Sequence, residues 1–237
     1  MMRGTAILLQ ARMGSTRLPG KSLRDLAGHT LLAHAVLRLQ ASGYPVVVAT
    51  TTKPEDDCLV AAAEDLKAHV FRGAEDDVLD RFAQAVRHFE LHRVVRATAD
   101  NPAVDIDAVS RSLALLDRTG SDHVVEYGLP TGGCVEAMKA NALLKAAAQA
   151  TDPYDREHVT PFIRRGQGFA VLSALAPGYL RRRGLRLTVD TEEDFSFMTK
   201  LFEALGPQFP APLSAILDVT DRMRNAAASG PGRREVR

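Results

Sequence analysis

The stretch LLQARMGSTRLPGKS, residues 8–22, follows directly on an apolar run and combines small residues with three cations. Its second half is similar to a phosphate-binding P-loop. However, Gly14 and Gly20 enclose five residues, whereas a P-loop has four between its first glycine and Gly-Lys-Ser. Pro19 lacks an N–H group and biases Leu18 away from helical geometry. We therefore predict a loop that is more open than a P-loop and depends more on side-chain cations.

The cations of this opening loop, residues 11–22, are Arg12, Arg17 and Lys21. Gly14 and Ser15 allow the backbone to approach a ligand closely and to offer N–H groups to an anion. Cations and backbone donors directly after a strand predict a cradle for a polyphosphate. A solvated surface loop is the alternative interpretation.

A P-loop ATPase would also need an apolar strand that ends in a magnesium-binding aspartate. The sequence RVVRATAD, residues 93–100, matches this requirement only in part, because Arg96 and Thr98 interrupt the apolar run. The P-loop ATPase class is therefore disfavoured.

The charge balance limits the possible partners. Lys and Arg total 30 against 29 Asp and Glu, so the formal charge of +1 gives no general attraction to nucleic acid or to an anionic membrane. Four tyrosines and no tryptophan leave few residues that could stack on bases. We expect neither nucleic acid nor a membrane as a partner, and a bound anion must meet a local cluster of cations.

The two cysteines, Cys58 and Cys134, lack the spacing of a metal site or of a disulfide framework. The apolar run at residues 6–9 is too short for a signal-peptide core or a transmembrane helix. These features favour a protein of the reducing cytoplasm.

Along the chain, short apolar runs alternate with segments of helical period, which is typical of a mostly parallel sheet covered by helices on both faces. The predicted strands are residues 5–10, 45–50, 69–72, 93–98, 169–174 and 185–189. The predicted helices are residues 30–41, 54–66, 77–89 and 107–116, one that starts at a capping box of Thr191 and Asp194, and one around residues 213–223. We expect a single Rossmann-like α/β domain over residues 1–228 and a flexible tail at residues 229–237.

In an open α/β sheet, ligands collect at the carboxyl ends of the strands. The segments that follow the predicted strands are the opening loop, residues 50–53, 72–77 and 100–102, and Asp190. A crevice that holds a basic loop and two carboxylates is the expected site. The loop at residues 128–133, rich in Gly and Pro, is expected to border it.

Five blocks of this sequence resemble, in the same order, blocks of the sugar cytidylyltransferases, the enzymes that make CMP-activated sialic acids and CMP-3-deoxy-manno-octulosonate. The likeness is strongest to the subgroup of the spore coat polysaccharide biosynthesis protein F. The blocks are QARMGSTRLPGKSL, VFRGAEDDVLDRF, VVRATADNPAVD, REHVTPFIRR and LTVDTEEDF. The resemblance covers most of residues 5–205.

This resemblance implies a nucleotide-diphosphosugar transferase fold and a magnesium-dependent transfer from CTP to a sugar or sugar acid, with release of pyrophosphate, in surface polysaccharide or glycoconjugate biosynthesis. Arg12 and Lys21 match the residues that bind the triphosphate and act in catalysis. The nucleotide-binding set it implies is Ala11, Arg12, Met13, Gly14, Ser15, Lys21 and Arg72, the last as a reader of cytosine. Asp100 and Asp190 match the two carboxylates that hold magnesium.

The chemistry of the residues agrees, because magnesium takes carboxylate, phosphate and water oxygens. Each carboxylate also has an alternative role. Asp100 could cap a turn before Pro102, and Asp190 could cap the helix that follows it.

On the acceptor side, the candidates are Glu136 and Arg164, and a structural role is open for each. His158 has two interpretations, a substrate contact or a chain entry into a helix or interface. Cys134 is expected to be a structural thiol. It replaces an acidic residue of the relatives, and Ala99 stands where they commonly have Gly, so the acceptor half departs from the family pattern more than the nucleotide half.

Two other functions remain open. One is a nucleotidyltransferase that uses another nucleotide or a sugar 1-phosphate, and the other is a non-catalytic nucleotide-binding protein of the same fold. The resemblance also implies a homodimer, because the related synthetases commonly pair.

Overall fold

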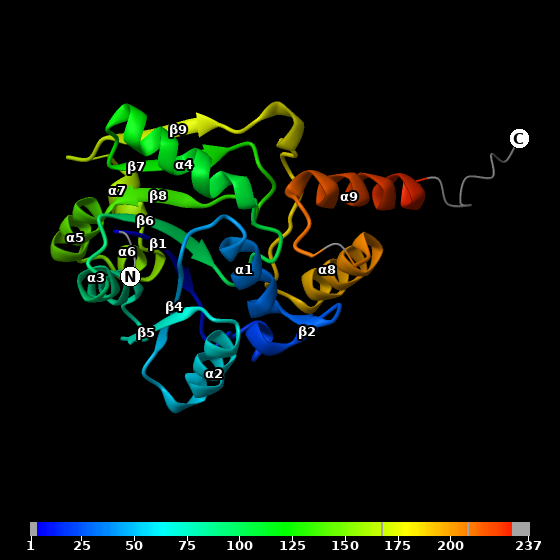
Figure 1. Cartoon of the computed structure of the whole chain (residues 1–237), viewed down its shortest axis with the longest axis horizontal. Coiled ribbons are helices and arrows are strands. Elements are labelled where there is room, and N and C mark those ends of the chain that lie inside the picture. Colours follow the sequence, from blue (N-terminus) through cyan, green and yellow to red (C-terminus); the bar gives the residue numbers. More distant parts are fainter. Residues whose placement is uncertain (1–3, 167, 208, 229–237) are drawn as a thin grey trace, which may run out of the picture.

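The computed structural model describes residues 4–166, 168–207 and 209–228. Its main element is a seven-stranded sheet of order β5-β4-β1-β6-β8-β7-β9. The strands are β1 (Thr5–Gln10), β4 (Val46–Thr51), β5 (His69–Gly73), β6 (Arg93–Thr98), β7 (His123–Tyr127), β8 (Glu136–Lys139) and β9 (Val171–Leu175). Strand β8 is antiparallel to both of its neighbours and the other pairs are parallel, so six strands end at the same edge (Figure 1).

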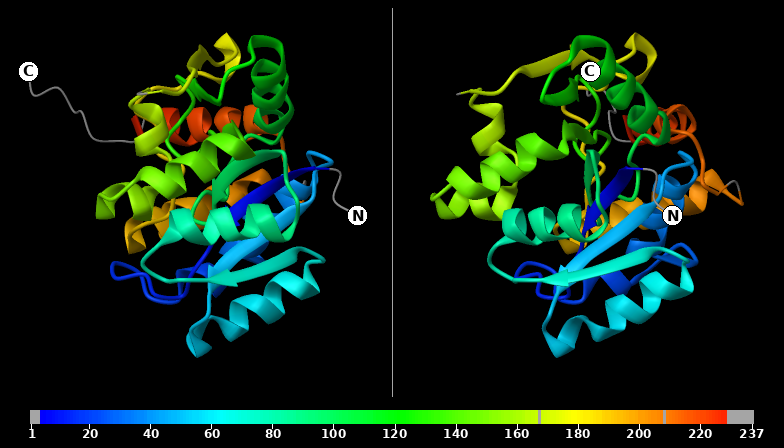
Figure 2. Two further views of the ribbon diagram at one scale, coloured as in Figure 1. Left: turned by 90° about the vertical axis from the view of Figure 1, so that its left-hand side faces the viewer. Right: turned by 60° about the vertical axis from the view of Figure 1, so that its left-hand side comes forward.

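Helices cover both faces of this sheet (Figure 2). On one face, α3 (Val78–His88), α5 (Ala140–Gln149) and α7 (Pro161–Arg164) contribute to a common apolar core. On the other face, the core contains residues of α1 (Leu31–Gln40), α2 (Asp57–Asp65) and α4 (Ile106–Thr119). The predicted α/β class is confirmed.

The burial of strand β1 on both faces of the sheet explains why its sequence is a continuous apolar run. Ala6 and Leu8 pack into the core of α3 and α5, whereas Ile7 and Leu9 pack into the core of α1, α2 and α4. A strand that is buried on both faces has no solvent side, so its sequence does not alternate. It ends at Gln10, where the opening loop begins.

A third apolar cluster lies beyond this sheet. It is built on α8 (Glu192–Leu205) and α9 (Leu213–Ala228) and includes Leu18 of the opening loop. Figure 1 shows α9 extending away from the sheet. The capping box predicted at the start of α8 is confirmed, because Thr191 accepts from Asp194 N and Asp194 accepts from Thr191 N.

The strand predicted at residues 185–189 is wrong. This segment forms one isolated bridge, between Thr131 and Arg186, and its backbone otherwise bonds to loop residues, with Val189 N donating to Asp100 O at 2.8 Å. Leu185, Leu187 and Val189 are buried in the third cluster. Packing against α8 and α9 therefore produces the alternation that predicted a strand.

The alternation of apolar runs and helical segments weakens in the middle of the chain, and several elements there were not predicted. They are the strands β7 and β8 and the helices α5, α6 (Pro153–His158) and α7. Buried polar and charged residues weaken the pattern in the two strands, because His123, Glu126 and Glu136 occupy strand positions that apolar side chains usually fill. The tail predicted at residues 229–237 lies outside the described residues. In the described part of the chain, no helix combines the length and the apolar character needed to cross a membrane.

Candidate active site

The opening loop folds back on itself and then enters a single turn of 3-10 helix, η1 (Lys21–Leu23). Met13 O accepts from Ser15 N at 2.8 Å and from Gly20 N at 3.3 Å. Gly20 has φ 69°, the left-handed conformation that glycine adopts without strain. A P-loop would continue into a long α-helix, so the loop has the more open form that its sequence predicts.

Two anchors hold this loop against the sheet. Leu18 is 6% exposed in the third cluster, and Met13 N donates to Asp56 Oδ1 at 2.7 Å. Asp56 Oδ2 also accepts from both hydroxyls at the end of β4, Thr50 at 2.9 Å and Thr51 at 2.5 Å. Burial raises the pKa of Asp56, but these hydrogen bonds outweigh it and hold the pKa below its usual value. Sequence reasoning missed Asp56, which reads as an ordinary acidic residue in the first turn of a helix.

Lys21, Asp100 and Asp190 meet at the carboxyl edge of the sheet. Lys21 Nζ lies 3.1 Å from Asp190 Oδ1 and 3.6 Å from Asp100 Oδ2, and it donates to Val189 O at 2.6 Å. Burial raises the pKa of Asp190, but the hydrogen bond and charge of Lys21, followed by Arg186 and Arg17, lower it overall. The sequence therefore predicted correctly that these three side chains share one crevice.

The geometry also decides whether Asp100 and Asp190 act as caps of a turn or a helix. The side chains that cap α8 are Thr191 and Asp194, and Asp194 Oδ2 also accepts from Asp190 N at 2.9 Å. The carboxylate of Asp190 is thereby free of the helix and faces Lys21, Arg17 and Arg186. Within the described chain, the side chain of Asp100 makes one polar contact, the ion pair with Lys21. Neither carboxylate acts as a cap.

A first cavity of 380 Å³ opens between these groups and the opening loop. This volume is within the range of about 300–1,000 Å³ that is usual for ligand sites. Its lining includes Ala11, Arg12, Ser15, Arg17, Lys21, Ala99, Asp100 and Asp190. Among the described residues, the side chain of Arg12 makes one polar contact, a long ion pair at 3.8 Å from Glu157, so most of its donors are available to a ligand.

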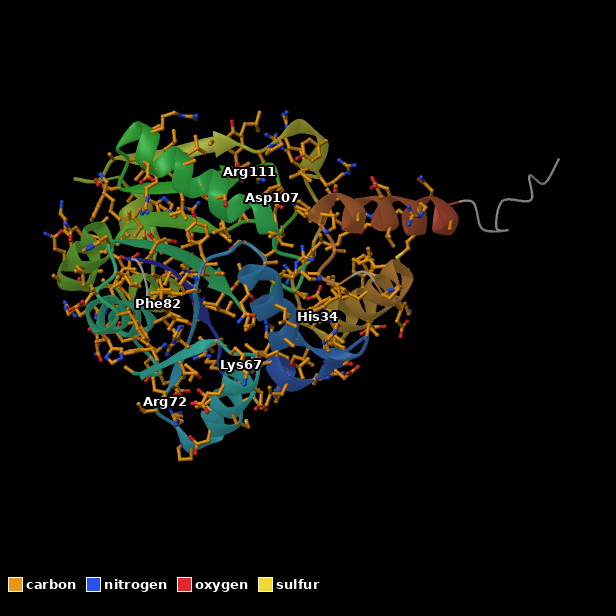
Figure 3. All side chains as sticks on the ribbon, viewed as in Figure 1. His34, Lys67, Arg72, Phe82, Asp107 and Arg111 are labelled. Atoms are coloured by element: carbon orange, nitrogen blue, oxygen red, sulfur yellow. The ribbon has the colours of Figure 1, made fainter. Side chains whose placement is uncertain are left out.

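Arg72 is not brought into this cavity. Its Nε donates to Thr51 O and its Nη2 to Lys53 O, both at 2.8 Å, and its Nη1 pairs with Asp57. Figure 3 shows Arg72 beside α2. These contacts join the ends of β4 and β5. Met13 accepts hydrogen bonds within the loop, and neither Met13 nor Gly14 is among the residues that line the cavity.

A second cavity, of 620 Å³, adjoins the first. The two share Arg96, Thr98 and His158. The loop at residues 128–132 forms part of its wall, as the sequence predicted, together with Cys134, Glu136, Thr160 and Arg164. The structure therefore brings both acceptor-side candidates, Glu136 and Arg164, into one cavity.

Glu136 is held firmly within this wall. It accepts from Arg96 Nη1 at 2.9 Å and from Thr160 Oγ1 at 3.0 Å, and His123 Nε2 lies 3.3 Å away. Burial raises the pKa of Glu136, but His123, Arg96 and Thr160 together lower it to about 2. The carboxylate is ionised and its oxygens are engaged, so it acts on Arg96 more directly than on a ligand.

Arg96 is the cavity-lining residue that sequence reasoning missed. It reads as an interruption of an apolar strand, yet this position puts its guanidinium on the wall between the two cavities. The available signal was a charged residue inside a strand otherwise buried on both faces.

His158 lies at the end of α6, and Val159 follows with φ 70°. A β-branched residue pays a steric penalty in this conformation, and such strain is typical of functional sites. Val159 is fully buried, so packing holds the turn. The turn lets both His158 and Thr160 reach the cavities, which favours the substrate-contact interpretation of His158.

Cys134 has the expected character of a structural thiol. Burial, followed by the charge of Glu136, raises its pKa above the usual value. A raised pKa keeps the sulfur protonated and makes it a poor nucleophile.

Comparison with known proteins agrees with this fold. The family described as Cytidylyltransferase matches residues 6–224, so the chain belongs to that family and is a nucleotidyltransferase. The spore coat polysaccharide biosynthesis protein SpsF of Bacillus subtilis is 35% identical over 234 residues, which cover 95% of this chain and 98% of that protein.

Two further comparisons support the same family. The 3-deoxy-manno-octulosonate cytidylyltransferase of Chelativorans sp. is 32% identical over 204 residues, covering 75% of this chain and 80% of that protein. The solved structure of a cytidylyltransferase from Leptospira borgpetersenii superposes with a TM-score of 0.83 at 27% identity, covering 96% of both chains. The resemblance found in the sequence is thereby confirmed.

Proposed function

We propose that this protein transfers the CMP group of CTP to a hydroxyl of a sugar or sugar acid and releases pyrophosphate. One observation carries the proposal: two cavities share a wall of Arg96, Thr98 and His158, and the first contains Lys21, Asp100 and Asp190. A transfer between two substrates needs two adjoining sites whose contents meet. The names of the relatives SpsF and 3-deoxy-manno-octulosonate cytidylyltransferase support this reaction class.

The first cavity takes the nucleotide. Arg12, Arg17 and Lys21 line it, and these cations match the negative charge of a triphosphate. Lys21 is the most enclosed of the three, with 12% of its side chain exposed. An ammonium group in such a place stabilises the charge that develops as pyrophosphate departs, because little water screens it.

Asp100 and Asp190 are the residues that would hold Mg²⁺. Both approach the same cation, Lys21 Nζ, and both are hard oxygen donors, so the donor set fits a magnesium ion completed by phosphate oxygens and water. Among the described residues, no cluster of three or more potential metal ligands occurs, which suits an ion that arrives with its nucleotide. When bound, Mg²⁺ would neutralise negative charge on the phosphate groups.

The second cavity takes the acceptor. In this proposal the acceptor hydroxyl attacks the α-phosphorus of CTP at the wall between the cavities, and the bond from that phosphorus to the bridging oxygen of the β-phosphate breaks. Pyrophosphate leaves with the proton that the hydroxyl has lost. The residues of the chain hold the two substrates in line and exclude water from the attacking position.

The test is pyrophosphate release by the purified protein with magnesium, each nucleoside triphosphate in turn, and a panel of sugars and sugar acids. We expect release with CTP alone. The variant Asp100→Asn should lose it, whereas Asp65→Asn, an exposed carboxylate on α2, should not. Unchanged turnover in Asp100→Asn would refute the metal assignment, and release with other nucleotides only would refute the choice of CTP.

A further inference from the structure

The proposed reaction moves a proton as well as a CMP group. The acceptor hydroxyl loses its proton as it attacks phosphorus, and a side chain that takes this proton must lie where the two substrates meet. Among the described residues, the two cavities share three lining residues, Arg96, Thr98 and His158. These three are the candidates for the base.

Of the three shared residues, His158 alone can accept a proton near neutral pH. The guanidinium of Arg96 has no acceptor site and stays charged, and Thr98 offers a hydroxyl that already accepts from Asn101 Nδ2 at 2.7 Å. An imidazole, in contrast, ordinarily changes its charge between about pH 5 and 8. The wall between the cavities therefore contains one suitable base.

The carboxylates that line one cavity or the other have other partners. Arginine side chains bind Glu126 at 2.6 Å and 3.0 Å and Glu136 at 2.9 Å. Asp100 and Asp190 pair with a lysine and are the proposed magnesium ligands. Glu157 lines the first cavity alone, away from the shared wall, and faces an arginine at 3.8 Å. None of these groups competes with the imidazole for the proton of the acceptor.

The imidazole of His158 is available to a substrate. Within the described chain, its ring nitrogens make no hydrogen bond and no ion pair. Its ring packs edge-on against the ring of Tyr154, with 4.3 Å between centroids and 64° between planes. This contact restrains the plane of the imidazole without using a nitrogen. A neutral imidazole keeps one nitrogen that can accept a proton.

The short helix that carries His158 is anchored at both ends. Asp152 caps the start of α6, and Arg156 donates to Asp77, the residue that caps α3. Val159, directly after His158, is fully buried in its turn of φ 70°. A catalytic group must be held in place by its surroundings, and these contacts provide such a support.

Building on the proposed function, we infer that His158 is the general base of the transfer. Its free ring nitrogen takes the proton of the acceptor hydroxyl while the hydroxyl oxygen forms its bond to the α-phosphorus. The bond from that phosphorus to the bridging oxygen breaks, and the imidazolium then gives the proton to the departing pyrophosphate. His158 lines both cavities, so it reaches both groups. The imidazole ends neutral, and no further reactant is needed.

The experiment compares wild type with His158→Gln and His158→Ala. His88→Gln is the matched control, because His88 is an exposed histidine on α3. Pyrophosphate release is measured with CTP, magnesium and a panel of 3-deoxy-manno-octulosonate, N-acetylneuraminate and neutral hexoses. With the acceptor that wild type uses, both His158 variants should lower kcat about 100-fold or more, the usual contribution of a general base. KM for CTP and for the acceptor should change less than threefold, and His88→Gln should resemble wild type.

Chemical rescue provides a readout that a structural role would not affect. His158→Ala leaves room for a small base, so added imidazole should raise its kcat at least tenfold and should not affect His88→Gln. In a series of substituted imidazoles, the rescue should grow with the basicity of the added ring, because the ring takes the proton in the transition state. If His158→Ala fails to fold, the split between kcat and KM in His158→Gln decides.

Two results would overturn the inference: a kcat of His158→Gln within threefold of wild type, or a folded His158→Ala that no imidazole rescues. Either result requires an active wild type, so it leaves the proposed function intact. Failure of the proposed function would appear as no pyrophosphate from CTP with wild type and any acceptor. That result would refute both the proposed function and the role of His158 in it.

Discussion

Lys21 Nζ lies 3.1 Å from Asp190 Oδ1, although 169 residues separate the two in sequence. The same ammonium group lies 3.6 Å from Asp100 Oδ2. One side chain thus joins the opening loop to the ends of two distant segments. It pairs with both carboxylates in the free protein, and in the proposed reaction a bound triphosphate would compete for it.

We predict that Lys21→Met lowers kcat/KM for CTP by at least 100-fold, or about 3 kcal/mol of transition-state stabilisation, because the variant loses the most enclosed cation of the site. The measurement is pyrophosphate release at varied CTP. Lys200→Met is the control, since Lys200 is exposed on α8. A loss below threefold would mean that Lys21 only holds the loop.

Asp194 should matter for stability through the helix cap. Its Oδ2 accepts from Asp190 N at 2.9 Å and from Thr191 N at 3.0 Å. We expect Asp194→Ala to lower the free energy of unfolding by about 1–2 kcal/mol, in urea denaturation, because these donors lose their partner. Glu193→Ala, an exposed change in the same helical turn, should have little effect. Equal effects of the two would contradict the capping role.

His34 should make stability depend on pH. It is 1% exposed on α1, its Nε2 lies 2.7 Å from Leu26 O, and Figure 3 shows it on the side of α1 that faces α8. Its pKa falls from 6.5 to about 4 overall. Burial is the largest cause, and the nearby charges of His29 and Arg38 also lower the pKa, whereas the Leu26 carbonyl and Asp25 raise it.

The sign of this effect follows from the lowered pKa. The unfolded chain takes up a proton on His34 near pH 6.5, whereas the folded chain resists protonation until about pH 4. The contribution of neutral His34 to the free energy of unfolding is therefore complete above pH 6.5 and is lost as the pH falls toward 4. Between pH 7 and pH 5 we expect a loss of about 2 kcal/mol, which His34→Gln should abolish. Parallel stability curves of the two proteins in urea would contradict this prediction.

Arg72 should support structure rather than read the base. Its guanidinium bonds to Thr51 O, Lys53 O and Asp57, outside the first cavity. We expect Arg72→Gln to lower the midpoint of thermal unfolding and to keep the preference for CTP over UTP. A variant of normal stability that had lost this preference would restore the base-reading role predicted from the sequence.

Much of the fold could be predicted because its central strands carry simple patterns. Thr5–Gln10 and Arg93–Thr98 have the predicted bounds, and the α8 capping box is local chemistry. Predictions failed where the pattern of apolar and charged residues in a segment results from contacts with parts of the chain that are distant in sequence. Leu185, Leu187 and Val189 alternate because they pack on α8 and α9, and β7 and β8 were missed because Glu126 and Glu136 are charged but paired in space.

The sequence by itself determined that the charged side chains of the first cavity would meet. Lys21, Asp100 and Asp190 each follow a strand or an extended segment at the carboxyl edge, and chain order in a parallel sheet is enough to bring them together. Only the tertiary structure decided how the charged side chains of the second cavity are arranged. Arg96 and Glu136 became a pair through the register of two antiparallel strands, and Arg164 joined them from a separate helix. Such contacts depend on which strands become neighbours, and local sequence carries no signal of that choice.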